Sequence, residues 1–426
     1  MSELQDHPQR YALANELHAR PFPSLAAPAH AVYLAVKRPE DAAGRDRDAD
    51  LAHLLDLLDR FGAQHPKPGA THYFADLGPF RLKWEQHTEF VTYTAIVDGV
   101  EGRPFDKAAF SVFPDDWLAQ APGARITSGF LRFEPFTTAE EVVAKLSDWF
   151  VGDSLAASEI LDGAAVMAGD FRIDSAGHMR FAVFPRPDTG PARCGRILQR
   201  ICEIETYKTM SMLGFARARE LSPRLGELDN RLNALMKETT AQSAPAEHTL
   251  GGLLQITAEL EQLLSQSAFR FSATDAYSTL VLDRIRVLRE ERFENRQTFH
   301  EFMARRFDPA MRTVRSAEAR LRSMAERAAR AGELLRTRVD VERSAQNQKL
   351  LESMDRRADL QLRLQETVEG LSVVAISYYA VSLAAYLLYP AASVAGVSKG
   401  WLTALLVPVV VGLVFVLVRR VRKRLK

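Results

Sequence analysis

The stretch LSVVAISYYAVSLAAYLLYP, residues 371–390, decides how the rest of the chain is organised. It has no charged side chain, and about 20 residues of helix cross the ~30 Å hydrocarbon layer of a bilayer. A second uncharged run, WLTALLVPVVVGLVFVLV, follows at residues 401–418 after the short loop AASVAGVSKG. Its Pro408 and Gly412 are compatible with a membrane helix. The pattern predicts a transmembrane hairpin over residues 371–418.

The distribution of basic residues predicts the orientation of this hairpin. Its C-terminal flank, residues 419–426, reads RRVRKRLK, and Arg356, Arg357 and Arg363 precede the first span, whereas the loop between the spans has only Lys399. Positive residues stay on the cytoplasmic side, and the first thirty residues contain no secretory signal pattern. We therefore expect a membrane-anchored protein with both termini cytoplasmic, held by membrane lipid.

Composition and cysteine usage fit a folded cytoplasmic body. The 426 residues are 47% hydrophobic and 26% charged, with a formal net charge of +1. Because the basic tail holds much of the positive charge, the rest of the chain is slightly acidic, which argues against a nucleic-acid partner. Cys194 and Cys202 are two helical turns apart, too far for a disulfide along one helix. They are expected to be reduced, buried thiols.

Residues 311–370 contain no proline and are predicted to form a long stalk helix, about 90 Å in length. Apolar or small residues recur three and four apart at Val314, Ala317, Leu321, Met324, Ala328, Ala331 and Leu335. This coiled-coil-like seam favours packing against other helices. The preceding residues 191–310 predict a helical bundle, with helices over 194–221, ending before Pro223, and over 224–238, 250–266 and 274–304.

Residues 1–190 have a different periodicity and predict a cytoplasmic domain with both strands and helices. PFRLKWE, TEFVTYTAIV, FLRFE and HMRFAVF alternate apolar and polar residues, as half-buried strands do. A leucine stripe over 51–61 and a capping box at Thr138 and Glu141 predict helices between them. The whole chain is therefore expected to be α+β: a mixed or mainly antiparallel sheet with helices on one face, then bundle, stalk and hairpin.

The standard catalytic and cofactor motifs are missing. The sequence contains no GxxxxGK[ST], GxGxxG, HExxH, CxxC or GxSxG pattern. His65, His72 and His87 fit surface or core histidines better than metal ligands, and Asp115 with Asp116 fits a helix start. Asp170 and Asp174 fall on one side of a strand-like segment, where they could bind a divalent ion only with further oxygen ligands. We expect no enzyme, no cofactor and no resident metal.

The segment NELHARPFP, residues 15–23, offers the densest group of ionisable side chains, Glu16, His18 and Arg20. On a regular helix Glu16 and Arg20 lie one turn apart and His18 points elsewhere, and Arg20 before a proline favours a helix end. The segment is interpreted as a helix terminus that docks the N-terminus onto the body. Arg20 as an anion or partner contact is the second interpretation, and acid–base catalysis is the third.

Polar residues near the first span give two further hypotheses. Ser372, Tyr379 and Tyr386 are seven apart and share one helix face, where they would either line a pore or form interhelical hydrogen bonds. Glu366 and Glu369 lie just before the span and would form an acidic ring if the stalk oligomerises, or otherwise a solvated helix end. Neither span contains an ionisable group that could relay protons, which disfavours a proton-coupled transporter.

NELHARPFPSL, THYFADLGPFRLKWEQHTEF and the hairpin together resemble a bacterial family of functionally uncharacterised membrane-anchored proteins, over nearly the whole chain. The resemblance implies membrane attachment and no assigned activity. The order of domain, bundle, long helix and two spans is also similar to CorA-type magnesium channels. That second likeness implies a pentamer with a pore-lining first span. Those channels end this span with Gly-Met-Asn, whereas this chain reads LLYPAASVAGV.

Three functional hypotheses follow. The first is an oligomeric, inner-membrane-anchored protein without catalytic activity, whose large cytoplasmic domain senses or binds a partner. The second is a CorA-like ion channel or transporter, a pentamer that conducts divalent cations although it lacks the Gly-Met-Asn motif. A membrane-tethered hydrolase is a third and weaker hypothesis because the hydrolase motifs are missing.

Overall fold

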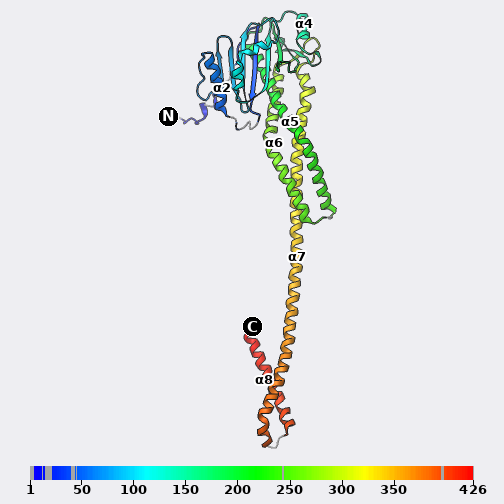
Figure 1. Cartoon of the computed structure of the whole chain (residues 1–426). Coiled ribbons are helices and arrows are strands. Elements are labelled where there is room, and N and C mark those ends of the chain that lie inside the picture. The colour runs from blue at the N-terminus through cyan, green and yellow to red at the C-terminus, as the bar shows by residue number, and fades with distance from the viewer. Residues whose placement is uncertain are drawn as a thin grey trace. The chain divides into compact units, whose positions relative to one another are not determined.

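The computed structural model describes residues 4–11, 13–14, 22–39, 44, 46–241, 244–394 and 398–425 (Figure 1). The chain divides into two compact units. The first comprises Met1–Ala241 with Gly251–Ala331, and the second comprises Gln242–Leu250 with Gly332–Lys426. Each unit is described by itself below.

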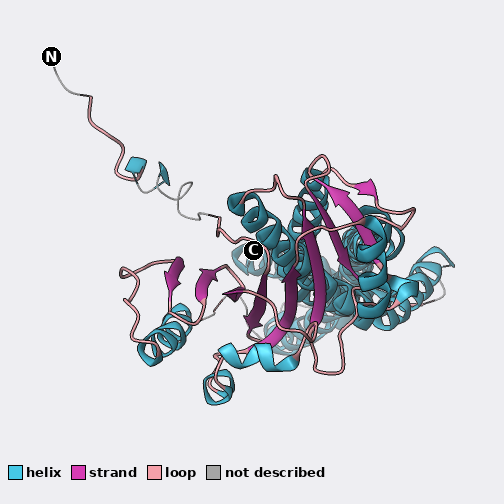
Figure 2. Cartoon of the chain, turned by 90° about the horizontal axis from the view of Figure 1, so that it is seen from above, coloured by secondary structure: helices cyan, strands magenta, loops and turns pink. Residues whose placement is uncertain are grey.

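The first unit is built on a nine-stranded sheet in the order β2-β3-β4-β1-β5-β8-β7-β6-β9 (Figure 2). The strands are β1 (Ala29–Lys37), β2 (His72–Asp76), β3 (Arg81–Gln86), β4 (Phe90–Asp98), β5 (Ala124–Phe133), β6 (Ala156–Ile160), β7 (Ala165–Gly169), β8 (Met179–Pro185) and β9 (Glu291–Arg292). The β5–β8 pair is parallel and the other described pairs are antiparallel. The predicted mixed, mainly antiparallel sheet is confirmed.

Short helices cover one face of this sheet. They are α2 (Arg47–Arg60), α3 (Asp115–Ala119) and α4 (Ala139–Trp149), with 3-10 turns at Lys107–Val112 and Gly152–Ser154. The Thr138 hydroxyl accepts a hydrogen bond from the Glu141 N–H, which confirms the predicted cap of α4. Leu82 and Trp84 from β3 are fully buried on this face with Leu54 of α2 and Trp117 of α3.

Long helices cover the opposite face. They are α5 (Pro191–Ala241), α6 (Ala246–Leu288) and the first part of α7 (Phe299–Val394). The Tyr33 hydroxyl on β1 is hydrogen-bonded to Thr206 of α5, and the Phe181 ring on β8 lies 6.4 Å from that of Phe299. The helices within residues 1–190 lie on one face, as expected, but the sequence did not predict that the bundle helices cover the other face. Polar side chains such as Lys83, only 5% exposed, are buried beneath α5.

Three predicted helix boundaries are wrong. α6 runs from Ala246 to Leu288 without the expected break between residues 266 and 274. α5 continues through Pro223 instead of ending before it, because Leu221, Leu225 and Leu228 are buried on both sides of the proline and offset its lost hydrogen bond. The predicted helix over 274–304 is interrupted after Leu288. Arg289 there has a left-handed backbone with φ of 49°, and β9 then pairs with β6 before α7 begins.

The second unit contains most of α7 and all of α8 (Lys399–Leu425). Each helix contains an 18-residue window apolar enough to cross a membrane, with mean hydropathy of 1.8 and 2.7. Figure 1 shows α8 beside the C-terminal end of α7. Ser377 of α7 is 5% exposed and Val410 of α8 is half-buried, whereas Leu387 is 80% exposed. Length and composition thus agree with a membrane hairpin.

Two buried histidines belong to the core of the first unit. His53 lies between the Tyr93 hydroxyl, 2.9 Å away, and the Trp117 carbonyl, 3.0 Å away, and burial lowers its pKa. His178 is within 2.9 Å of the Ser128 hydroxyl. Burial lowers the pKa of His178 to about 4, with Arg125 acting in the same direction and Asp174 opposing it. Both imidazoles are neutral in the folded protein at pH 7.

We predict that His178 makes the first unit sensitive to mild acid. Its pKa is about 4 when folded against 6.5 ordinarily, so the unfolded chain binds the extra proton and the free energy of unfolding falls as the pH drops from about 6.5 to about 4. The loss is on the order of 2 kcal/mol after allowance for solvent screening. His178→Gln should flatten this part of the stability profile, measured by denaturant unfolding of the detergent-solubilised chain. His65→Gln, which alters an exposed histidine, is the control, and equal slopes for His178→Gln and wild type would refute the prediction.

Candidate functional site

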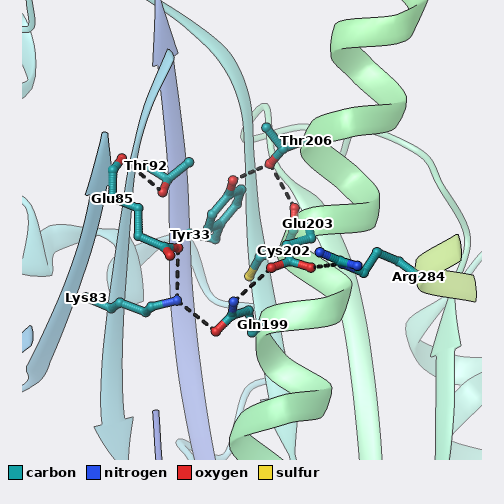
Figure 3. A network of polar contacts seen from close by, with 9 residues as sticks. All are labelled: Tyr33, Lys83, Glu85, Thr92, Gln199, Cys202, Glu203, Thr206 and Arg284. Atoms are coloured by element: carbon teal, nitrogen blue, oxygen red, sulfur yellow. Dashed lines mark hydrogen bonds and ion pairs between the residues drawn. The ribbon is translucent and has the colours of Figure 1, made fainter. Parts of the chain in front are cut away.

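A network of polar side chains fills the space between the sheet and α5 (Figure 3). The Lys83 ammonium lies 2.9 Å from the Glu85 carboxylate and donates to Gln199 at 2.8 Å. Gln199 in turn donates to Glu203 at 2.8 Å, and Glu203 also accepts a hydrogen bond from Arg284 of α6. The chain of contacts therefore joins β3, α5 and α6.

This network has no room for a substrate. The cavity beside it measures about 20 Å³, which is enough for about one water molecule. Cys202 lies in the same layer, and burial raises the pKa of its thiol well above the ordinary value. A protonated, buried thiol is a poor nucleophile. The network is best explained as the polar part of the packing between α5 and the sheet.

A much larger cleft of about 620 Å³ lies where β1 ends and β5 begins, beside α5 and α6. We call it the basic cleft, after the five cationic side chains that line it: Lys37, Arg38, Arg125, Arg217 and Arg270. Ile126, Leu213 and Phe269 supply an apolar wall, and the Phe269 side chain is 45% exposed. The backbone at Gly123 packs directly against the end of β1, where only glycine fits, because a Cβ there would lie 2.8 Å from the Lys37 carbonyl carbon.

The positive charge of the basic cleft is only partly neutralised. Arg270 is paired with the buried Glu89 carboxylate, and Arg217 lies 3.0 Å from Glu220. Among the described residues, Lys37, Arg38 and Arg125 form no ion pair. The Arg270 Nη1 is buried and has no acceptor within the described part of the chain.

The pKa shifts of two groups in and beside the basic cleft reflect their burial and the charges around them. Burial lowers the pKa of Lys37, Arg270 lowers it further and Glu89 opposes the shift. The neighbouring Tyr277 hydroxyl has its pKa raised by burial and by the Glu89 carboxylate. The described lining residues include no carboxylate, imidazole or thiol. The cleft therefore offers anion-binding donors beside an apolar wall, without an acid–base pair.

The remaining candidate residues of the sequence analysis do not form a shared site where the structure describes them. Glu16, His18 and Arg20 lie outside the described residues. His65 is exposed and contacts Asp59, and His87 stacks on Phe90 at 4.4 Å. Asp170 accepts from Arg180 at 2.6 Å and from the Val151 N–H, which gives it a structural role. In the residues that the structure describes, no three His, Cys, Asp or Glu side chains are grouped to hold a metal.

The residues predicted near the membrane are on the surface of the single chain. Ser372 donates its hydroxyl to the Val368 carbonyl at 2.8 Å, and Tyr379 and Tyr386 are 67% and 77% exposed. Glu369 accepts from Gln365 at 3.3 Å, and Glu366 is exposed. A pore or an acidic ring would require further copies of the chain.

Sequence reasoning missed every cationic residue of the basic cleft. They come from β1, β5, α5 and α6, and the fold alone brings them together. Only the adjacent pair Lys37 and Arg38, at the end of a buried strand, is a signal in the sequence, and it is a weak one.

Comparison with known proteins gives one match. The family described as "Protein of unknown function (DUF3422)" matches residues 5–425, nearly the whole chain. No curated protein and no solved structure matches.

Proposed function

We propose a function for this member of DUF3422, the family of unknown function to which the chain belongs. The protein is a non-catalytic, membrane-anchored homo-oligomer whose cytoplasmic body binds a small organic anion in the basic cleft. The observation that carries the proposal is the excess of cationic groups beside the apolar wall of that cleft.

The dimensions and lining of the basic cleft support a small-molecule ligand. Its volume of about 620 Å³ lies within the range of known ligand pockets, roughly 300–1,000 Å³. Guanidinium groups bind carboxylate, sulfonate or phosphate through paired hydrogen bonds, and Phe269 and Leu213 would contact an apolar portion. An amphiphilic anion satisfies both halves of the cleft. The lack of an acid–base pair among the described lining residues favours binding over catalysis.

The apolar helices support the anchor in the bacterial inner membrane. The Lys399 ammonium lies 5.9 Å from the Tyr386 ring centre and 5.8 Å from that of Tyr389, and tyrosines concentrate at membrane interfaces. The basic residues beyond Val418 favour a cytoplasmic C-terminus and a short external loop, with both termini in the cytoplasm.

The part of α7 that precedes the span supports self-association. Leu350, Met354, Leu364 and Val368 are each more than half exposed in the single chain. At about 100° per residue they fall on one side of the helix, whereas Leu351 and Leu362 fall about 100° away. Such an exposed apolar stripe is typical of an interface, and a second copy of the same helix would bury it as a coiled-coil seam.

The first prediction of this proposal concerns the basic cleft. 1-Naphthalenesulfonate, a rigid amphiphilic anion, should bind the detergent-solubilised full chain in isothermal titration calorimetry. Arg125→Gln combined with Arg217→Gln should weaken binding about tenfold or more, since two charge-assisted hydrogen bonds are lost. Arg219→Gln, which changes an exposed arginine two residues further along α5 and on another side of the helix, should leave the affinity unchanged. Equal affinities for the double variant and wild type would exclude the cleft as the binding site.

The second prediction concerns the apolar stripe. Leu350→Gln combined with Leu364→Gln should reduce the mass of the particle, measured by native mass spectrometry in detergent, because both changes place polar groups in the proposed seam. Leu351→Gln combined with Leu362→Gln alters the same residue type in the same helix but on another side. An unaltered oligomer in the first variant, or a monomeric wild type, would contradict self-association through this face.

A CorA-like channel is the second candidate function, with divalent cations as its cargo. The observation that favours it is the unbroken course of α7, which runs from Phe299 to Val394 as one helix. In a pentamer its exposed Ser372, Tyr379 and Tyr386 would face the axis, with Glu366 and Glu369 as an acidic ring at the entrance.

Ion flux separates the two candidates. With the full chain in proteoliposomes, the anchor function predicts influx of Mg²⁺ and Co²⁺ equal to that of empty vesicles. Saturable influx that Tyr379→Leu alters and Tyr378→Leu does not would support the channel instead, because Tyr378 is equally exposed but lies on another side of the helix.

A further inference from the structure

Five arginines surround a second cleft, which is separate from the basic cleft and measures about 430 Å³. Arg193, Arg196 and Arg200 project from the first turns of α5, spaced three and four residues apart so that they share one side of the helix. Arg286 and Arg289 come from the end of α6. We call this group the arginine cleft. Its remaining lining residues are Leu161 and Val287.

Backbone contacts fix the two helix ends that carry these arginines. The Leu161 N–H, in the turn between β6 and β7, donates to the Leu288 carbonyl at 2.7 Å. The Leu25 N–H donates to the Pro191 carbonyl at the start of α5 at 3.2 Å. β9 then joins the sheet three residues after α6 ends. The five guanidinium groups are therefore mounted on elements held by the sheet.

Most of the positive charge in the arginine cleft lacks a counter-charge. Arg286 lies 2.8 Å from Asp283, and Arg289 lies 2.6 Å from Asp162. Within the described ranges, Arg193, Arg196 and Arg200 have no ion pair. Like charges placed together in this way repel one another unless an anion lies between them.

The environment of Arg200 shows this repulsion. Burial lowers the pKa of its guanidinium, and Arg196, Arg284 and Arg289 lower it further. Glu203 is the carboxylate that opposes the shift, and it already accepts hydrogen bonds from Gln199 and Arg284 in the polar network under α5.

The backbone at Arg289 adds a second, independent observation. Its φ of 49° belongs to the left-handed region, where glycine is the usual residue after a helix. A non-glycine residue costs roughly 1 kcal/mol there. Arg289 thus stands at the cleft with a backbone conformation that is unfavourable for any residue with a side chain. Residues with strained backbones are frequent at binding sites.

We propose that the arginine cleft binds a compact anion that carries two or more phosphate groups. Guanidinium groups pair with phosphate oxygens through two parallel hydrogen bonds, and five of them match a multiply charged anion better than a single carboxylate. The described lining residues include no aromatic ring that could stack on a nucleobase, so recognition would rest on the phosphates. The same chemistry is presented by a free polyphosphate and by the headgroup of cardiolipin, which carries two phosphates.

The test uses tripolyphosphate and the full chain in nanodiscs of phosphatidylcholine, titrated by calorimetry at fixed ionic strength without divalent cations. Wild type should bind tripolyphosphate more tightly than orthophosphate. Arg196→Gln combined with Arg200→Gln should weaken tripolyphosphate binding at least about tenfold. The same variant should melt at the wild-type temperature or higher in the absence of ligand, because repulsion is relieved.

Two control variants remove the same charge elsewhere. Arg219→Gln with Arg312→Gln neutralises two exposed arginines outside both clefts, and Arg125→Gln with Arg217→Gln alters the basic cleft. Neither should change the affinity for tripolyphosphate. Equal weakening by the exposed pair would show that only overall charge matters and would overturn the proposal, as would an Arg196/Arg200 variant that binds like wild type.

A second arm identifies the source of the phosphate. In nanodiscs that contain cardiolipin, weaker tripolyphosphate binding by wild type, but not by the Arg196/Arg200 variant, would show competition by the lipid headgroup. Equal affinity in neutral and anionic nanodiscs would identify a soluble polyphosphate as the ligand.

Discussion

The packing of α5 on the second face of the sheet is the contact on which the rest of the body depends. Part of this contact is polar: Lys83 and Glu85 of β3 lie opposite Gln199 and Glu203 of α5. A buried charge without a partner is costly, whereas a fully connected network is tolerated and fixes one register. Because α5 carries residues of both clefts, its register on the sheet also sets where Arg200 and Arg217 lie.

The sequence predicted the elements of the fold better than their mutual packing. Alternation found β3, β4 and β8, and the spacing at Thr138 found the start of α4, because these signals are local. The second covered face was missed because Lys83 and Thr92 are residue types that ordinarily face water, and the Gln199 partner of Lys83 is 116 residues away in the sequence. Pro223 was misread for a related reason, since tertiary burial of leucines outweighs one lost hydrogen bond.

The two clefts were harder to predict from the sequence than the packing of the helices. Arg193, Arg196 and Arg200 show helical spacing, but such a run normally describes a solvated helix face. The run becomes part of a cleft only in the folded protein, because the turn after Ile160 holds the end of α6 next to the start of α5. Arg286 and Arg289 then lie beside the three arginines of α5. The clefts also differ in chemistry. Phe269 and Leu213 give the basic cleft an apolar wall, whereas guanidinium groups dominate the arginine cleft. The ligands proposed for the two clefts therefore belong to different classes of anion.

The short strand β9 bears on how the protein is made. Glu291 and Arg292 complete the edge of the sheet beside β6, although all the other strands are encoded before residue 186. Domains tend to fold from the N-terminus during synthesis, so the sheet remains open at that edge while α5 and α6 are still being translated. An exposed strand edge invites pairing with another chain. β6 is therefore open to pairing with another chain from the completion of β8 until β9 is translated, which happens before the apolar hairpin is made.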